Sequence, residues 1–239
     1  MGVGWNRQLP NLGDTTTTSV IRYGPDTATE ADLRLLGPVN GKRVLDLGCG
    51  NGQAAIAFAK QGAHAIGLDP SQDLLNAAKR WSERENVKVE LHHGDLADLA
   101  FMRADSVDLV FSAWAFGGVA DLTRVFRQAH RILRQGSPLV FSMPHPVYDV
   151  IDDNDVEQPL LVRRSYFDRS PIADEADGPF AEHHHTLADI FMGLTRNNFR
   201  VDVLLEPESV EARSMSPYWR EANLWLPRTL VVRARKEGI

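Results

Sequence analysis

Residues 44–52 read Val44-Leu45-Asp46-Leu47-Gly48-Cys49-Gly50-Asn51-Gly52, so an apolar run passes directly into a glycine-rich turn. Apolar residues at helical spacing follow over Gln53–Gln61. Glycine has no Cβ atom, so a turn built from it bends sharply and lets a ligand approach the backbone N–H groups. The stretch therefore predicts a buried strand, a ligand-binding loop and a helix, in that order.

Similar strand–turn–helix units follow along the chain as far as residue 143. This alternation is typical of right-handed βαβ units, which build a parallel sheet covered by helices. Two later apolar runs leave no room for a full helix between them, so we expect them to pair antiparallel. The predicted strands are Arg43–Leu47, Ala65–Asp69, Lys88–His92, Val107–Ser112, Pro138–Met143, Phe199–Leu205 and Arg228–Arg235, and the further predicted helices are Asp73–Glu85 and Leu122–Leu133.

These elements predict a doubly wound, Rossmann-like α/β fold of three layers, α/β/α, with a seven-stranded, mostly parallel sheet whose last strand is antiparallel. At 239 residues the chain is long enough for one such domain to bury a sizeable core. Two segments lie outside this scaffold, and loops of such length in a compact domain are usually functional lids or disordered. We predict one domain over 1–239, with an N-terminal cap at 1–30 and a lid, or substrate insertion, at 144–186.

The composition indicates which kinds of partner are disfavoured and which cellular compartment is expected. A net charge of −6 argues against the broad basic surface that nucleic acids select. Cys49 is the only cysteine, so an intrachain disulfide and a cysteine-rich zinc site are excluded, which fits a reducing compartment. No apolar run approaches the length that spans a bilayer, and the first residues lack a signal core. We expect a cytoplasmic monomer or homodimer without nucleic-acid binding or membrane insertion.

The glycine-rich turn suits two kinds of cofactor. A dinucleotide-binding loop has glycines spaced G-x-G-x-x-G, but here Gly52 falls one residue early and Gln53 takes the expected place. Asp69 follows Gly50 by about 20 residues and ends a predicted strand, where a carboxylate accepts hydrogen bonds from two ribose hydroxyls. The position of Gly52 counts against an NAD-dependent oxidoreductase, which stays an alternative.

Asp46-Leu47-Gly48-Cys49-Gly50-Asn51-Gly52 resembles the first motif of class I S-adenosylmethionine-dependent methyltransferases, and the chain is similar to their UbiE-like small-molecule members. In that family the loop wraps the methionine half of the cofactor. The resemblance continues in Ile66-Gly67-Leu68-Asp69-Pro70-Ser71 and in Gly94-Asp95-Leu96. It implies that S-adenosyl-L-methionine is the cofactor, held by Asp46, Gly48, Gly50, Gly52, Asp69 at the ribose, and Asp95 with Leu96 at the adenine.

The crevice beside this loop supplies further candidates. Ser112 and Trp114 end the fourth predicted strand, at the switch point where ligands of doubly wound sheets bind. We predict that Ser112 contacts the cofactor and Trp114 the acceptor. Many members of the family carry a histidine a few residues later, whereas this chain has Phe116. Tyr23 belongs to an N-terminal segment that in similar enzymes folds over the cofactor, so it is a cofactor candidate.

The candidates for binding or activating the methyl acceptor follow the fifth predicted strand. His145 follows that strand at its carboxyl end and is our candidate general base; the alternative is a loop histidine bonded to the backbone. In the lid, His184 and Tyr166 are candidates for binding the acceptor. Adjacent residues of a strand point to opposite faces, so in the run His183-His184-His185 at most His183 and His185 could share a metal ion. No convincing third and fourth ligand is present, so no metal site is predicted.

The sequence therefore predicts an enzyme that transfers a methyl group from S-adenosyl-L-methionine to a small-molecule acceptor. An oxygen, a nitrogen or an activated carbon fits, and metabolite or cofactor biosynthesis is the expected setting. A non-catalytic module that binds the cofactor is the second alternative, because fold and pocket do not prove chemistry.

Overall fold

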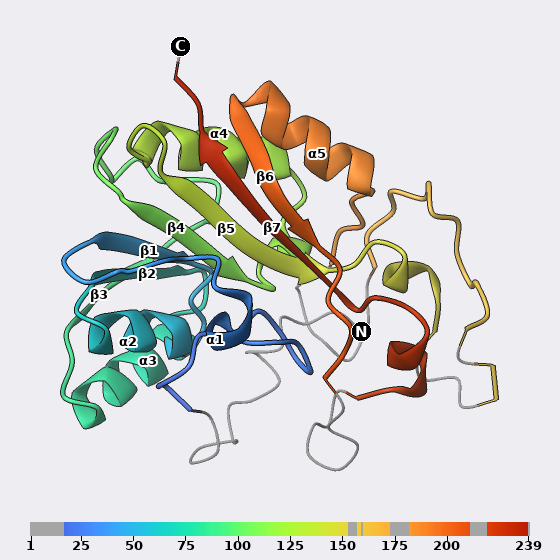
Figure 1. Cartoon of the computed structure of the whole chain (residues 1–239), viewed down its shortest axis with the longest axis horizontal. Coiled ribbons are helices and arrows are strands. Elements are labelled where there is room, and N and C mark those ends of the chain that lie inside the picture. Colours follow the sequence, from blue (N-terminus) through green and yellow to red (C-terminus); the bar gives the residue numbers. More distant parts are fainter. Residues whose placement is uncertain (1–16, 153–156, 159, 173–181, 211–218, 239) are drawn as a thin grey trace.

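The computed structural model of the protein describes residues 17–152, 157–158, 160–172, 182–210 and 219–238. Within these residues the chain forms a seven-stranded sheet in the order β3-β2-β1-β4-β5-β7-β6 (Figure 1). Strands β1 to β5 are parallel, and β7 runs antiparallel to both β5 and β6, which confirms the predicted fold class. The strands are β1 Arg43–Leu47, β2 His64–Asp69, β3 Val89–His93, β4 Leu109–Ala113, β5 Pro138–Pro144, β6 Phe199–Leu205 and β7 Thr229–Lys236.

Helices cover both faces of the sheet (Figure 1). The short helix α1 and the longer α2 and α3 lie on one face, whereas α4 and α5 lie on the other. Three short 3-10 helices complete the described elements: η2 follows β4, η3 follows β5, and η5 precedes β7. Their bounds are α1 Glu30–Leu33, α2 Gln53–Lys60, α3 Gln72–Arg84, α4 Leu122–Ile132, α5 Leu187–Arg196, η2 Phe116–Gly118, η3 Tyr148–Val150 and η5 Glu221–Leu224.

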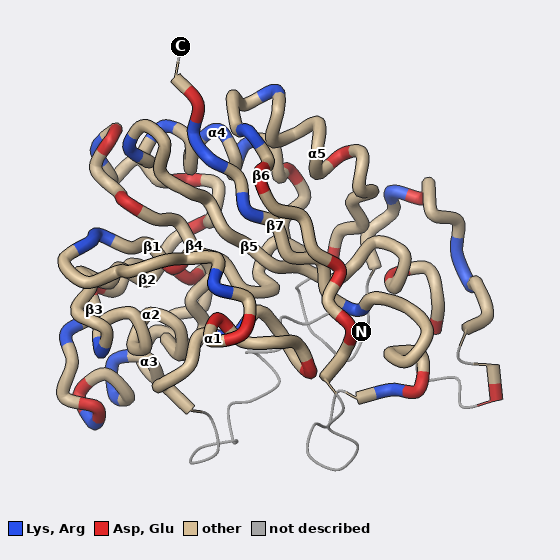
Figure 2. The backbone as a smooth tube through the Cα atoms, in the orientation of Figure 1, with Lys and Arg blue, Asp and Glu red and all other residues tan. Residues whose placement is uncertain are grey.

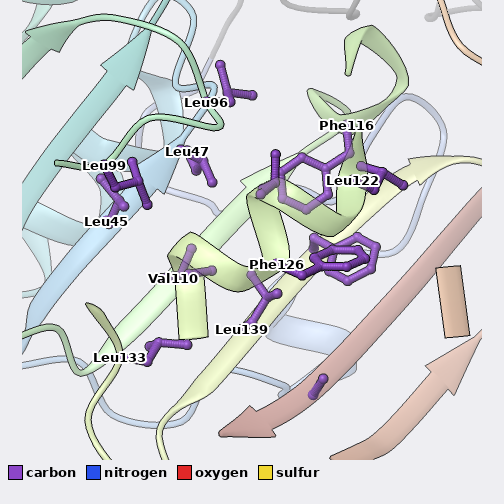
Figure 3. Close-up of a cluster of buried hydrophobic side chains, with 14 of the residues drawn as sticks. Leu45, Leu47, Leu96, Leu99, Val110, Phe116, Leu122, Phe126, Leu133 and Leu139 are labelled. Atoms are coloured by element: carbon purple, nitrogen blue, oxygen red, sulfur yellow. The ribbon is translucent and has the colours of Figure 1, made fainter. Parts of the chain in front are cut away.

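The core forms two layers because side chains alternate along each buried strand. On β1, Leu45 and Leu47 join the layer beneath α4 and α5, whereas Val44 joins the layer beneath α2. Figure 3 shows the first layer, in which Phe126 of α4 lies near Leu139 of β5. Its ring also packs against those of Phe116 and Phe141. Continuous apolar runs are therefore needed on the central strands, which is why their pattern identified them.

Helix α5 was not predicted. It begins after Thr186, whose hydroxyl accepts a hydrogen bond from the Asp189 N–H, while the Asp189 carboxylate accepts from the Thr186 N–H. This reciprocal pair is a capping box, and its sequence signature is present in the chain. The helix then packs on α4 and β6. The connection from β5 to β6 therefore contains a helix that the strand pattern alone did not predict.

The predicted lid contains little regular structure where it is described. Two isolated antiparallel bridges join Ile151 to Val162 and Ile172 to Glu182. Residues 153–156, 159 and 173–181 of the lid, and residues 1–16 of the predicted cap, lie outside the described residues. The division of the chain into one domain with a cap and a lid stays a prediction.

Candidate functional site

The glycine-rich loop leaves β1 at the carboxyl edge of the sheet. There the helix after β1 and the helix after β4 lie on opposite faces, which is the arrangement at which doubly wound sheets bind their ligands. The N–H groups of Gly48 and Cys49 donate to the Leu68 carbonyl oxygen at 2.8 and 3.0 Å. A Cβ atom on Gly48 would lie 2.2 Å from the Ala115 Cβ, and its φ of +81° is unfavourable for other residues. The loop geometry therefore requires glycine at this position.

Asp69 holds the loop from the end of the neighbouring strand. Its Oδ2 accepts from the Gly50 N–H and its Oδ1 from the Ser71 N–H, each at 2.8 Å. The residue is only 4% exposed. These bonds fix the orientation of the carboxylate beside the loop, as a residue that receives ribose hydroxyls requires.

Asp46 is a second buried carboxyl beneath the same loop. Its Oδ2 accepts from the Ala55 N–H in the first turn of α2 at 3.0 Å. Burial raises the pKa of Asp46 to about 7, the hydrogen bond from Ala55 opposes the shift, and the negative charge of Asp69 adds to it. Two acids beneath one loop favour a ligand that carries positive charge.

The Asp46 proton links stability to pH. The folded protein keeps this proton up to about pH 7, whereas an unfolded aspartate releases it near 3.8. The free energy of unfolding therefore falls as pH rises through this window. We expect the wild type to lose about 3 kcal/mol relative to Asp46→Asn between about pH 4.5 and about pH 8. Urea unfolding of both proteins at the two pH values measures this; parallel losses would contradict it.

Asn51 was not singled out from the sequence, although it lies inside the glycine-rich stretch. It is 4% exposed, and its Oδ1 has no hydrogen-bond partner among the described residues. Buried polar atoms in folded proteins are almost always paired. A ligand that donates hydrogen bonds into the loop would satisfy this oxygen.

Asp95 and Leu96 lie on the other side of the loop, after β3. Asp95 is exposed, and its Oδ1 accepts from the Ala97 N–H at 2.8 Å. Leu96 is buried, and its Cδ2 lies 3.3 Å from where a Cβ of Gly48 would be. The structure therefore brings the three predicted contact regions, the loop, Asp69 and Asp95–Leu96, to one edge.

Trp114 follows β4 on the opposite side of the loop from β2. Its backbone has a φ of +58°, and its N–H donates to the Ser142 carbonyl oxygen at 2.9 Å. The indole packs directly beneath Gly24, where an added Cβ would meet the indole Nε1 at 2.4 Å. The N-terminal segment therefore covers the indole.

Comparison with known proteins identifies the family. A family model described as a methyltransferase domain matches residues 44–136, which run from β1 to just beyond α4. The crystal structure of an S-adenosylmethionine-dependent methyltransferase from Mesorhizobium loti is 28% identical, with a TM-score of 0.73 over 86% of this chain and 96% of that one. The chain is a class I S-adenosylmethionine-dependent methyltransferase. This result decides against the NAD-dependent alternative.

Two curated relatives differ in how much of the methyltransferase they match. An uncharacterized protein from Haemophilus influenzae is 26% identical over 85% of each chain. The ubiquinone biosynthesis O-methyltransferase of Hahella chejuensis is 33% identical, but over only 43% of each chain. The match to this ubiquinone biosynthesis O-methyltransferase, the quinone relative, therefore spans less than half the length of that protein.

Two predicted cofactor contacts are placed differently in the methyltransferase. The Tyr23 ring is fully buried against Phe111, and its hydroxyl donates to Glu30 at 2.5 Å. The Ser112 hydroxyl is also fully buried and donates to the Leu47 carbonyl oxygen at 2.7 Å. Both side chains support the scaffold, so their placement does not favour direct contact with the cofactor. Their apolar surroundings could not be inferred from their positions along the chain.

His145 also has both ring nitrogens occupied. Nδ1 accepts from the Val147 N–H at 3.1 Å, so Nε2 carries the proton and donates to Glu206 at 2.8 Å. Desolvation lowers the pKa of His145, and the bond to Glu206 opposes this effect. Both ring nitrogens therefore bond within the protein, one to the loop of His145 itself and one to Glu206, and the general-base role stays a prediction.

The structure brings His184 and Tyr166 of the lid together. Their rings meet edge to face at 5.3 Å, and the Tyr166 hydroxyl accepts from the Leu187 N–H. The ring nitrogens of His184 lie 3.0 Å from Asp149 Oδ2 and 2.8 Å from the Tyr166 carbonyl oxygen. Both ring nitrogens are therefore engaged within the protein. His184 thus joins the lid to η3.

The described residues hold no group of three or more histidine, cysteine, aspartate or glutamate side chains arranged to bind a metal. In the His183-His184-His185 run, the neighbours of His184 bond elsewhere: the His183 N–H donates to Gly117 O, and His185 Nε2 bonds Val119 O. The three histidines therefore connect the lid to the segments that follow β4 and β5.

Proposed function

We propose that this methyltransferase transfers the methyl group of S-adenosylmethionine to a small-molecule acceptor, at an oxygen, a nitrogen or an activated carbon, in metabolite or cofactor biosynthesis. The observation that carries the proposal is the covering of the carboxyl edge of the sheet. Residues 183–185 bond to the segments after β4 and β5, and Gly24 lies on Trp114. A covered edge suits a small acceptor, which fits beneath such a lid.

The cofactor would lie along the loop between three groups of the protein. Asp69 would accept from the ribose hydroxyls, and Asp95 from the adenine amino group. The acidic surroundings of Asp46 and the unpartnered Asn51 oxygen suit the ammonium group of the methionine half. When bound, S-adenosylmethionine supplies an electrophilic methyl group on a sulfonium. The protein's part is to position the acceptor, exclude water and, where needed, move a proton.

The name of the ubiquinone biosynthesis O-methyltransferase suggests one class of acceptor. Its name describes O-methylation in ubiquinone biosynthesis, which favours a hydroxyl acceptor. Its likeness to this chain, however, covers only 43% of each protein, and the matching family model ends at residue 136. The residues after β5, which cover the site, lie outside that match.

Charge placement supports a small-molecule acceptor over nucleic acid. Figure 2 shows basic and acidic positions interspersed along the backbone. On β7, Arg233 and Arg235 both donate to Asp202, and Lys236 donates to Asp105. Such pairing leaves less net positive charge for phosphate contacts. Among the described helices, none has both the length and the apolar character needed to cross a membrane.

Calorimetric titration with S-adenosylmethionine, S-adenosylhomocysteine and NAD tests the cofactor assignment. We expect saturable binding of the first two and none of NAD. A screen of small hydroxylated, amino and unsaturated compounds, read as formation of S-adenosylhomocysteine, then tests the acceptor class. Turnover of protein or nucleic-acid substrates in place of all small molecules would contradict the proposal.

His145 is proposed to position its loop rather than to accept a proton. With an acceptor from the screen, His145→Gln is expected to change kcat less than about fivefold, whereas loss of a general base lowers rates by about 10²–10⁴. The pH–rate profile is the second readout, because a structural substitution leaves its shape unchanged. A loss of more than 100-fold, with the basic-side limb removed, would restore the general-base role.

A further inference from the structure

Strand β6 forms one edge of the sheet, and helix α5 packs along it (Figure 1). No strand among the described residues pairs with the outer side of β6. Gly193 of α5 faces α4, because a Cβ atom there would lie 3.2 Å from Cδ2 of Phe126. Phe191 precedes Gly193 by two positions, which is about 200° around a helix, so it faces away from α4. This side of α5 therefore borders the open edge of the sheet.

Three large apolar side chains are exposed along this border. Phe191 and Met192 of α5 are 47% and 42% exposed, and Leu204 of β6 is 45% exposed. Leu204 lies on the sheet face that α5 covers, because it pairs with Val232 of the layer beneath α5. Exposed apolar side chains that gather on adjoining elements mark interaction surfaces. We call this surface, formed by Phe191, Met192 and Leu204, the α5–β6 face.

A hollow of about 380 Å³ lies beside Phe191, where β6 begins. Phe199 and Val201 of β6 line it, and the ion pair between Arg200 and Glu237 borders it. A hollow of this size is large enough for an aromatic side chain. The same surface thus offers both exposed apolar side chains and a hollow that receives such side chains. A surface with both features is self-complementary, as a two-fold interface between identical chains requires.

The charges along the β6 edge are also complementary to one another. Arg196 and Arg200 lie at the start of β6, Glu206 and Glu208 follow its end, and all four are exposed. Antiparallel pairing of two identical strands places the start of each beside the end of the other. The basic residues of one copy then lie beside the acidic residues of its partner, twice across a two-fold axis, and opposite charges on adjacent strands stabilise their pairing.

An irregularity in β6 limits which strands can pair with it. The register to β7 shifts between Val201 and Val203, and bulges at sheet edges hinder pairing with unrelated strands. Asp202, at the shift, bonds Arg233 and Arg235, so its charge is balanced within the chain. Regular pairing is left to the short segment after the bulge, so a stable contact also needs the apolar side chains of α5. A second copy supplies a strand and a helix together.

We propose that the α5–β6 face binds a second copy of this chain around a two-fold axis, with the two β6 strands antiparallel and the two α5 helices in contact. The sheets of the two copies then join into one continuous sheet. The cofactor loop after β1 is separated from β6 by β4, β5 and β7 in the sheet order. The interface therefore leaves the loop and Asp69 accessible in both copies.

Sedimentation equilibrium of the full chain tests the proposal. We expect the wild type to have twice its chain mass of 26.6 kDa in the micromolar range. Phe191→Glu places a charge in the α5–β6 face and should weaken dimerisation about tenfold or more. Phe101→Glu is the matched control, because Phe101 is 46% exposed but stacks on His92 of β3, at the other edge of the sheet. It should leave the dimer unchanged.

An exchange of charges tests the antiparallel arrangement and decides the question if Phe191→Glu does not fold. Arg196→Glu and Glu208→Arg should each weaken the dimer about fivefold, whereas the double variant should restore it, because opposite charges again lie side by side. A monomeric wild type, a dimer that Phe191→Glu leaves intact, or equal weakening by Phe101→Glu would overturn the inference. A double variant that dimerises no better than the single ones would do the same. The measurement needs neither cofactor nor acceptor, so its outcome is independent of the proposed function.

Discussion

The Asp69→Ala variant is expected to bind S-adenosylhomocysteine about 100-fold or more weakly than the wild type. The Asp69 carboxylate would accept from two ribose hydroxyls, and hydrogen bonds to a charged group contribute about 1.5–3 kcal/mol each. The same carboxylate accepts from the Gly50 and Ser71 N–H groups, so its loss also frees the loop. Calorimetric titration of the two proteins measures the difference.

Two further variants separate charge from loop geometry. Asp69→Asn keeps one oxygen that can accept from the Gly50 N–H, but it loses the charge and the bond from the Ser71 N–H, so we expect an intermediate affinity. Asp73→Ala removes an exposed carboxylate from the first turn of α3 and should change the affinity less than twofold. If Asp69→Ala stayed within threefold of the wild type, the ribose assignment of Asp69 would be wrong.

Gly48→Ala is expected to have the largest effect on folding. The new methyl group would lie 2.2 Å from the Ala115 Cβ, so β1 and the segment after β4 must move apart. Overpacking of this kind is destabilising by about 1–3 kcal/mol, and a left-handed backbone adds about 1–2 kcal/mol for a residue with a Cβ atom. We therefore expect the free energy of unfolding to fall by about 3 kcal/mol, with loss of cofactor binding.

Gly41→Ala is the matched control. Gly41 has a φ of +72°, close to the +81° of Gly48, but no atom lies within 4 Å of an added Cβ. It should therefore show the backbone effect alone, about 1–2 kcal/mol, with normal cofactor affinity. Urea unfolding of both variants gives the comparison. Equal destabilisation by the two substitutions would show that the contact with Ala115 relaxes without penalty.

The sheet and the cofactor loop were predictable because their signals are local. Buried parallel strands read as apolar runs, and the turn after β1 contains its glycines within a few residues. For the same reason Asp69 and Asp95 were placed at the right edge: each directly follows or ends a strand. Predicted strand ends differ from those observed by two residues or fewer.

The acceptor side was less predictable because its contacts join distant parts of the chain. Tyr148 and Asn223 are 75 residues apart in sequence, yet their side chains share a 2.6 Å hydrogen bond. Nothing near Arg228 in the sequence indicates that it will lie between Trp114 and Tyr148. Likewise, the partner that occupies His145 is Glu206, which lies 61 residues away. Such pairings depend on the strand order, which a residue pattern does not specify.

The position of β7 has a consequence for how the protein is made. β7 lies between β5 and β6 in the sheet but follows both in the chain. On the ribosome, β5 therefore remains an open sheet edge, and β6 has no neighbouring strand, until residues 229–236 emerge. Open edges pair readily with other chains, and late long-range pairing slows folding. The nascent chain therefore has its greatest need of chaperones between the emergence of β5 and that of β7.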